Sequence, residues 1–143
     1  MIISGKKCLI DTNIFIYAQD KKSAHFEEAS KILRYLNEEK FQAFITLQNL
    51  LEYSAVLTRF YKYPKKDVVS DLKILVSNPK IVKLYPSDKT TVEFLKLMEK
   101  EPKIYIYDLY LVAYMKVYGI EVIITDDMDF KQIKDIEVIN PFG

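Results

Sequence analysis

Acidic side chains occupy the positions of this sequence that are best suited to chemistry. Asp11 directly follows the apolar run Cys8-Leu9-Ile10, and a group of three aspartates at 126–129 follows a second apolar run at 122–124. Glu52 and Asp108 each stand in a segment with helical character. If these side chains meet, their oxygen atoms could hold a divalent cation, so their chemistry would be catalysis by a metal ion.

Electrostatics favours a cation at such a site. Four carboxylates about 5 Å apart would repel one another by roughly 3 kcal/mol per pair at an effective dielectric constant near 20. A bound divalent cation or raised pKa values must relieve this repulsion. The chain has one histidine and one cysteine, which cannot form a soft ligand cluster. The donors therefore favour Mg²⁺ or Mn²⁺ over Zn²⁺.

Each acidic residue also has a purely structural interpretation. Asp11 could cap the helix that follows it, Asp108 could cap its own helix, and Glu52 could be an ordinary surface residue. The aspartates at 126–129 could form a calcium loop, but the EF-hand pattern requires a glycine and a closing glutamate that are missing here. These alternatives remain open when each stretch is considered by itself.

The elements that must position these residues alternate along the chain. Short apolar runs predict strands at 8–10, 41–46, 81–84 and 121–124, with a last edge strand near 136–139. Helices are expected at 12–18, 23–37, 47–61, 64–77, 87–100 and 106–118. Strands alternating with helices indicate an α/β fold with a parallel sheet, whose strand carboxyl ends share one edge. Asp11 and the aspartates at 126–129 should meet at that edge, and Glu52 and Asp108 can join them.

Apolar residues at helical spacing predict which helix faces point inward. Ser23 is expected to cap the helix at 23–37, whose apolar stripe is formed by Ala29, Ile32, Leu33 and Leu36. The stripe of the helix at 47–61 is Leu47, Leu50, Leu51, Ser54 and Leu57. In the helix at 87–100, the inward residues are Val92, Leu95 and Met98. The helix at 106–118 is apolar almost all round, so Asp108 on its packed side needs a cation or hydrogen-bond donors.

Composition limits the class of protein. A chain of 143 residues that is half hydrophobic, with three glycines and five prolines, predicts a single domain over 1–143. Its single cysteine, Cys8, is expected in the core, and His25 at the surface. The absence of a signal-peptide run or of a long apolar segment predicts a soluble, cytoplasmic protein without membrane association. The net charge of +1 neither supports nor excludes nucleic acid.

Aromatic and basic residues offer two further candidates. Tyr110, Tyr114 and Tyr118 form a column at i, i+4 spacing that favours packing or a subunit contact over base stacking. Lysines at 62, 65 and 66 flank two tyrosines, and a solvated turn is the preferred interpretation over contact with nucleic acid.

The ordered set of motifs resembles the PIN-domain nucleases and, in size and order, the VapC-type toxin ribonucleases. The motifs are Leu9-Ile10-Asp11-Thr12-Asn13, Glu52 on a helix, Asp108-Leu109-x-x-x-Ala113, and Thr125-x-Asp127-x-Asp129-Phe130. The resemblance spans nearly the whole chain, and four motifs in order are more specific than any one of them.

The resemblance implies a PIN-like three-layer α/β/α sandwich around a central, mainly parallel sheet of four to five short strands. It implies a Mg²⁺- or Mn²⁺-dependent endoribonuclease in which Asp11, Glu52, Asp108 and Asp127 are catalytic and hold the metal. Asp129 assists as a further ligand, and Thr125 and Asn13 brace the site. Asp126 occupies a variable position and has no assigned role.

The resemblance also bears on substrate and partners. It implies RNA as substrate, a homodimer, and a small antitoxin protein that fills the acidic groove. Tyr107 departs from the small or polar residues that often precede the acidic residue in this family, which bears on substrate range. Lysines nearest the motifs in sequence are expected to offset the repulsion of RNA at the rim. These are Lys6, Lys7, Lys131 and Lys134.

Two other functions compete with the nuclease. The first is a catalytically inactive PIN-like module that binds RNA or assembles with other proteins, since fold does not dictate activity. The second is a phosphatase or receiver-like domain, which needs an acidic pair or Asp-x-Asp after the first strand. Asp11-Thr12-Asn13 supplies only one carboxylate there.

Overall fold

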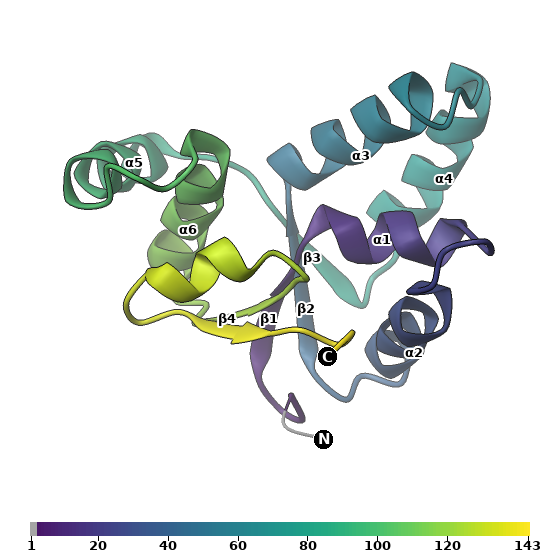
Figure 1. Ribbon diagram of the computed structural model, residues 1–143, viewed down its shortest axis with the longest axis horizontal. Helices are drawn as coiled ribbons and strands as arrows, with labels where there is room; N and C mark the ends of the chain where they lie inside the picture. Colours follow the sequence, from purple (N-terminus) through teal and green to yellow (C-terminus); the bar gives the residue numbers. More distant parts are fainter. Residues whose placement is uncertain (1–2) are drawn as a thin grey trace.

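A five-stranded parallel sheet forms the centre of the computed structural model, which describes residues 3–143 (Figure 1). The strands are β1 (Lys7–Ile10), β2 (Gln42–Thr46), β3 (Ile81–Leu84), β4 (Val122–Ile124) and β5 (Glu137–Ile139). Their order in the sheet is β3-β2-β1-β4-β5, and every neighbouring pair is parallel. All strand carboxyl ends therefore point to the same edge, as the alternating pattern predicted.

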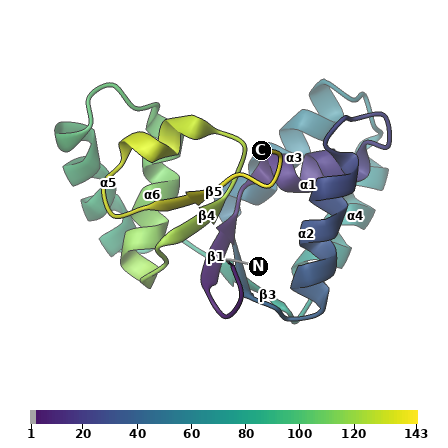
Figure 2. The same ribbon diagram turned by 60° about the horizontal axis from the view of Figure 1, so that its bottom comes forward.

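Six helices and one 3₁₀ helix cover the two faces of this sheet. They are α1 (Thr12–Gln19), α2 (Phe26–Asn37), α3 (Leu47–Arg59), α4 (Lys65–Ser77), α5 (Asp88–Lys100), α6 (Ile106–Tyr118) and η1 (Met128–Gln132). The first four helices lie on one side of the sheet, and α5 and α6 lie on the other (Figures 1 and 2). The predicted α/β/α layering is therefore confirmed.

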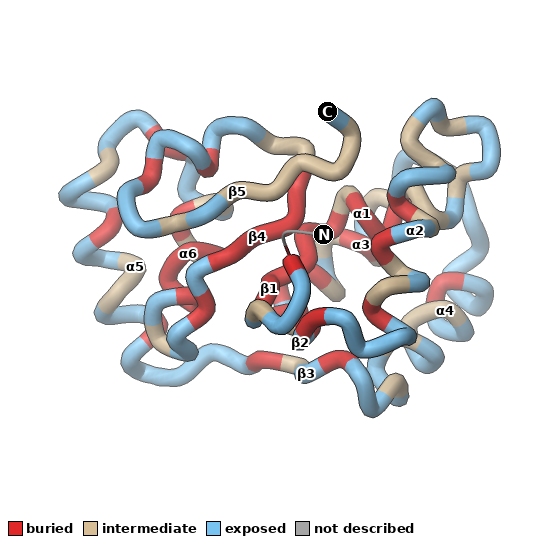
Figure 3. The backbone as a smooth tube through the Cα atoms, turned by 90° about the horizontal axis from the view of Figure 1, so that it is seen from below, coloured by how far each residue is buried: buried red, intermediate tan, exposed pale blue. Residues whose placement is uncertain are grey.

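Alternation along each strand divides the core into two clusters. In β1, Cys8 and Ile10 pack against the α1–α4 side, while Leu9 packs against the α5–α6 side. The central strands are buried on both faces, and β4 is buried along its whole length (Figure 3). Cys8 is a free, fully buried thiol whose pKa rises to about 12 because of burial, which confirms its place in the core.

Gly119 ends α6 as the sequence indicated. It adopts a left-handed conformation with φ of 68°, and the N–H of the residue after it, Ile120, donates to the carbonyl of Met115. Such a conformation is strained for residues with a Cβ atom. Gly119 thus turns the chain back into β4 and toward the edge where Asp127 lies.

Some predicted helix details are wrong. Ser23 does not cap α2, which begins at Phe26, because the Ser23 hydroxyl instead accepts from the N–H of His25 in the turn before it. His25 itself is half-buried, with its ring 4.9 Å from that of Tyr17 and 4.4 Å from that of Phe142. The single histidine is thus part of an aromatic cluster and not a free surface residue.

The predicted inward face of α3 is also only partly correct. Leu57 is buried and Leu50 is partly buried, but Leu47 and Leu51 are exposed. Two polar residues, Gln48 and Asn49, are buried instead. Asn49 forms a capping box with Thr46, so the start of α3 turns its polar side chains inward.

In α5, the residues predicted to point inward, Val92, Leu95 and Met98, are exposed. Thr90 and Leu97 are buried in their place. The Thr90 hydroxyl accepts from the backbone N–H of Ser87 in a capping box, which turns this face of the helix inward. Along residues 3–143, none of the helices combines the length and apolar character needed to cross a membrane.

Candidate metal centre

Asp11 stands at the carboxyl end of β1, as predicted, and is 8% exposed. Its Oδ1 accepts from the N–H of Thr12 at 2.8 Å, and its Oδ2 accepts from the hydroxyl of Thr125 at 2.7 Å. Burial raises the pKa of Asp11 to about 6, although both hydrogen bonds act to lower it. Asp11 therefore caps α1 and also lies in the acidic site, so the two interpretations of this residue are compatible.

Thr125, at the end of β4, connects several parts of the site. Its hydroxyl donates to Asp11 and accepts from the N–H of Asp127 at 3.0 Å and from Nδ2 of Asn13 at 3.2 Å. A hydroxyl with one donor and two lone pairs is fully used by these three contacts. Thr125 thus fixes the Asp127 backbone relative to Asp11.

Glu52 is half-buried and is held by two side chains. Its Oε1 accepts from Nε2 of Gln48 at 2.7 Å, and its Oε2 accepts from the hydroxyl of Thr12 at 3.1 Å. Gln48 is one turn earlier on α3, and Thr12 is the first residue of α1. These contacts aim Glu52 toward the crevice and not toward bulk solvent.

Asp108 lies in the first turn of α6 and is half-buried. No residue that the structure describes donates a hydrogen bond to its carboxylate, so the capping alternative does not apply. Burial raises its pKa to about 7, with further contributions from the nearby carboxylates of Asp127 and Asp11. A cation bound beside this carboxylate would favour its ionised form and lower its pKa.

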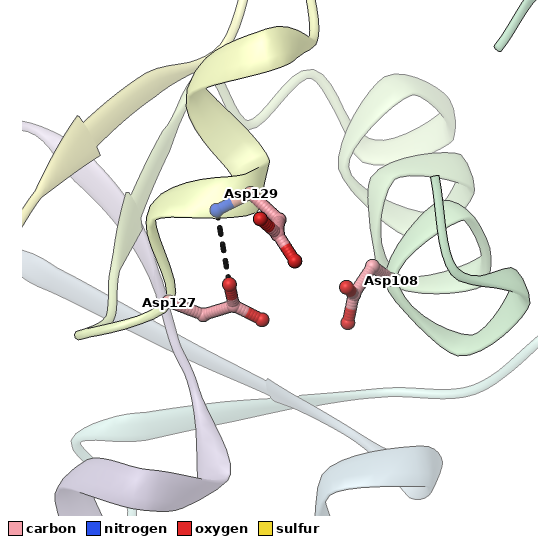
Figure 4. A group of neighbouring side chains, drawn as sticks. All are labelled: Asp108, Asp127 and Asp129. Carbon is pink, nitrogen blue, oxygen red and sulfur yellow. Dashed lines mark hydrogen bonds between the residues drawn. The ribbon is translucent and has the colours of Figure 1, made fainter. Parts of the chain in front are cut away.

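Asp108, Asp127 and Asp129 bring carboxylate oxygens within 4.8 Å of one another. Figure 4 shows Asp108 pointing from α6 toward the two aspartates at the start of η1. Asp127 Oδ1 also accepts from the N–H of Asp129 at 2.9 Å, which fixes the geometry of this pair. This acidic trio could hold one metal ion.

All five predicted acidic residues line one open pocket of about 870 Å³. Its lining residues are Asp11, Thr12, Asn13, Ile16, Tyr17, Glu52, Ala55, Val56, Arg59, Tyr105, Tyr107, Asp108, Leu111, Asp127 and Asp129. Asp11 and Glu52 stand outside the acidic trio, and their oxygens are engaged by protein donors. The candidate metal ligands in the pocket are carboxylate oxygens, which are the ligand type that suits Mg²⁺ and Mn²⁺.

Asp126, which had no assigned role, is not part of the acidic trio. Its Oδ2 accepts from the hydroxyl of Tyr17 at 2.6 Å, and its Oδ1 accepts from Nδ2 of Asn13. The role of Tyr17 was not foreseen, although Asn13 and Tyr17 share a face of α1 at i, i+4 spacing. Asn13 Oδ1 is buried without a hydrogen-bond partner in the described part of the chain.

Two of the four predicted rim lysines lie far from this pocket. Lys6 Nζ donates to the carboxylate of Glu137 at 3.0 Å, next to the start of β5, and Lys7 begins β1. Both therefore stand at the amino end of the sheet, opposite the acidic site. Lys131 and Lys134 are exposed in and after η1. Arg59, which was not among the predicted rim residues, is a basic residue that lines the pocket. It lies seven residues, or about two helical turns, after Glu52 on the same face of α3.

The chain belongs to the PIN domain family, since the family model matches residues 8–136. No curated protein matches the sequence.

Several solved structures share the fold. A chain of VapBC2 from Rickettsia felis, bound to a promoter DNA fragment, is 22% identical with a TM-score of 0.71, covering 94% of this chain and 98% of that chain. VapC20 of Mycobacterium tuberculosis, a sarcin-ricin loop cleaving toxin, is 17% identical with a TM-score of 0.71, and the match covers 92% of this chain and 98% of that chain. A chain of FitAcB from Neisseria gonorrhoeae is 17% identical with a TM-score of 0.72, and the match covers 94% of this chain and 98% of that chain.

Proposed function

We propose that this protein is a metal-dependent endoribonuclease that cleaves RNA phosphodiesters and acts as the toxin of a toxin-antitoxin pair. The observation that carries the proposal is the acidic trio of Asp108, Asp127 and Asp129, with oxygens within 4.8 Å, inside a pocket that Asp11 and Glu52 also line. Membership of the PIN domain family over residues 8–136 supports it. We further propose that residues 1–143 form a single PIN domain in the cytoplasm.

Mg²⁺ or Mn²⁺ would be held by Asp108, Asp127 and Asp129, with Asp11 and Glu52 completing the acidic lining. When bound, such an ion acidifies water and stabilises the negative charge that develops on the phosphate in the transition state. The residues of this chain position the ligands: Thr125 orients Asp11, and Gln48 orients Glu52. Without an ion, Asp108 is only partly ionised near neutral pH, because burial and the nearby carboxylates raise its pKa to about 7.

RNA with unpaired nucleotides is the proposed substrate. The pocket is open and lies at the carboxyl edge of the sheet, where a flexible single strand could bring its backbone to the carboxylates. A homodimer and a small antitoxin protein are the proposed partners. The similarity of fold to chains of toxin-antitoxin complexes, such as VapBC2 of Rickettsia felis, supports the antitoxin.

The test is cleavage of a mixed single-stranded RNA in Mg²⁺, Mn²⁺ or EDTA by the native protein, Asp11→Asn and Asp108→Asn. We expect cleavage in Mg²⁺ or Mn²⁺, none in EDTA, and a loss of at least a hundredfold in both variants. A native protein that binds RNA without cleaving it would support the inactive PIN-like module instead. A phosphorylated intermediate on Asp11 would support the phosphatase alternative.

A further inference from the structure

Two tyrosines form an exposed aromatic surface at the wall of the acidic pocket. Tyr105 is 62% exposed and Tyr107 is 55% exposed, and both line the pocket beside Asp108. Their ring centroids are 5.4 Å apart with an interplanar angle of 52°. Large aromatic side chains exposed together at a site usually mark a binding surface.

Tyr107 is tied to the acidic residues through its backbone. Gln48 Nε2 donates to the carbonyl oxygen of Tyr107 at 3.0 Å and to Oε1 of Glu52 at 2.7 Å. One amide group therefore fixes the start of α6 to α3. The backbone of Tyr107 is consequently held beside Asp108, the next residue in the chain, and its ring projects from this fixed point at the wall of the pocket.

Arg59 supplies positive charge to the same pocket. Among the residues that the structure describes, Arg59 is the one basic side chain that lines the pocket, and it forms no ion pair. The planar guanidinium group of arginine can bind phosphate oxygens through two parallel hydrogen bonds. The pocket thus combines carboxylates that could bind a metal ion, a guanidinium group that could bind a phosphate, and two exposed aromatic rings.

We infer that Tyr107, with Tyr105, stacks on an unpaired base next to the cleaved phosphodiester, and that Arg59 binds a neighbouring phosphate. This inference rests on the proposed ribonuclease function and narrows its substrate to single-stranded RNA with an unstacked base beside the cut. A paired base is covered by its neighbours in a duplex, whereas an unpaired base offers its face to an aromatic ring. Stacking tolerates any base, so it selects unpaired structure more than sequence.

A second copy of the chain is the competing occupant of this surface. Tyr107 also borders an apolar groove of about 430 Å³ formed with Leu47, Leu51 and Ile106. An apolar subunit contact would explain the exposed tyrosines, but it would leave Arg59 and the acidic trio unexplained. A nucleotide strand accounts for all of these groups, because it carries phosphates and aromatic bases together.

The first test measures RNA binding without cleavage. Fluorescence anisotropy of a labelled mixed single-stranded RNA in EDTA compares the native protein with Tyr107→Ala and Tyr107→Trp, and Tyr85→Ala is the matched control. Tyr85 is also exposed, at 53%, but lies outside the pocket. We expect Tyr107→Ala to weaken binding about tenfold, as for the loss of one stacked base. The RNA affinity of Tyr107→Trp and of Tyr85→Ala should remain within about twofold of that of the native protein, because neither change removes a stacked ring from the pocket.

Tyr107→Trp gives an independent signal, because the natural chain has no tryptophan. Its fluorescence should be quenched when RNA binds, while a Tyr85→Trp variant should not respond. Abasic nucleotides placed along the RNA should weaken native binding at one position. In Tyr107→Ala, the abasic change at that position should have no further effect, because the same stacking contact is already lost.

The second test separates Arg59 from the tyrosines. For single-stranded RNA, removal of one phosphate contact lowers the slope of log affinity against log salt concentration by about 0.7. Arg59→Ala should show this change, whereas Tyr107→Ala should leave the slope unaltered. Arg34→Ala is the control, since Arg34 is exposed near the end of α2 and lies outside the pocket.

The outcomes distinguish this inference from the proposed function. Native protein that cleaves RNA while Tyr107→Ala binds it as tightly would overturn the stacking inference and leave the nuclease intact. A change in molecular mass of Tyr107→Ala in sedimentation, with unchanged affinity for RNA, would identify a subunit contact instead. Native protein that neither binds nor cleaves RNA would overturn both.

Discussion

The hydroxyl of Thr125 donates a 2.7 Å hydrogen bond to Oδ2 of Asp11, which joins the carboxyl ends of β4 and β1. These strands are neighbours in the sheet, with Ile10 paired to Ile124. The contact therefore links the two halves of the acidic site, which lie 114 residues apart in the chain.

Thr125→Val should test this link, because valine keeps the side-chain shape and removes the hydroxyl that donates to Asp11 and accepts from Asp127 and Asn13. Buried Asp11 then loses one of its two hydrogen-bond donors, and we expect the free energy of unfolding at pH 8 to fall by about 1–3 kcal/mol. The fall should be smaller at pH 5, where Asp11 is mainly protonated, because its pKa is about 6. Urea unfolding measures the effect, and Thr125→Ser should restore the native value. An equal loss at both pH values would contradict this role.

Tyr17→Phe should test the contact between the Tyr17 hydroxyl and Asp126, which is 2.6 Å long. The phenyl ring retains the packing against His25 and Phe142, so only the hydrogen bond is removed. We expect a loss of about 1 kcal/mol in the free energy of unfolding. Tyr85→Phe, at an exposed position, is the control. Equal stability of the two variants would show that this hydrogen bond contributes nothing.

The metal-free protein should become less stable as pH rises from about 4 to 7. The pKa values of Asp11 and Asp108 are raised from 3.8 to about 6 and about 7, so the folded chain binds more protons than the unfolded chain in this window. The free energy of unfolding therefore falls as these protons are lost. Urea unfolding in EDTA across this range measures the slope.

Asp108→Asn should flatten this pH dependence, because the amide carries no charge. A slope identical to that of the native protein would contradict the raised pKa of Asp108. Mg²⁺ should raise the melting temperature of the native protein more at pH 8 than at pH 5, since protons compete with the ion for the carboxylates.

The sequence was sufficient to predict the parallel sheet and the place of Asp11. Short apolar runs alternating with helices leave few topologies, and each strand end must then lie at the shared edge. Asp108 stood out as a carboxylate on the packed side of an apolar helix, whereas Glu52 was harder to place, because its neighbours on α3 do not reveal whether it faces the crevice or solvent. The resemblance to the PIN-domain nucleases distinguished Glu52 from other acidic surface residues.

The remaining errors come from contacts that sequence spacing cannot reveal. In α5, Val92, Leu95 and Met98 were predicted to point inward, but Thr90 and Leu97 are buried instead, and Thr90 forms a capping box with Ser87 at the start of the helix. Lys6 is close to Asp11 in sequence, but a strand of four residues separates the two ends of the sheet. Arg59 is remote in sequence from the aspartates and lines the pocket because it follows Glu52 on the same face of α3.

Mn²⁺ binding followed by electron paramagnetic resonance tests whether Asp108, Asp127 and Asp129 hold a divalent cation. Asp126→Asn and Asp127→Asn are matched neighbours, since only Asp127 belongs to the acidic trio. We predict that Asp127→Asn and Asp108→Asn weaken Mn²⁺ binding at least tenfold, while Asp126→Asn stays within about twofold of the native protein. Equal Mn²⁺ affinity in all four proteins, or no binding by the native protein, would show that the acidic trio does not hold the cation.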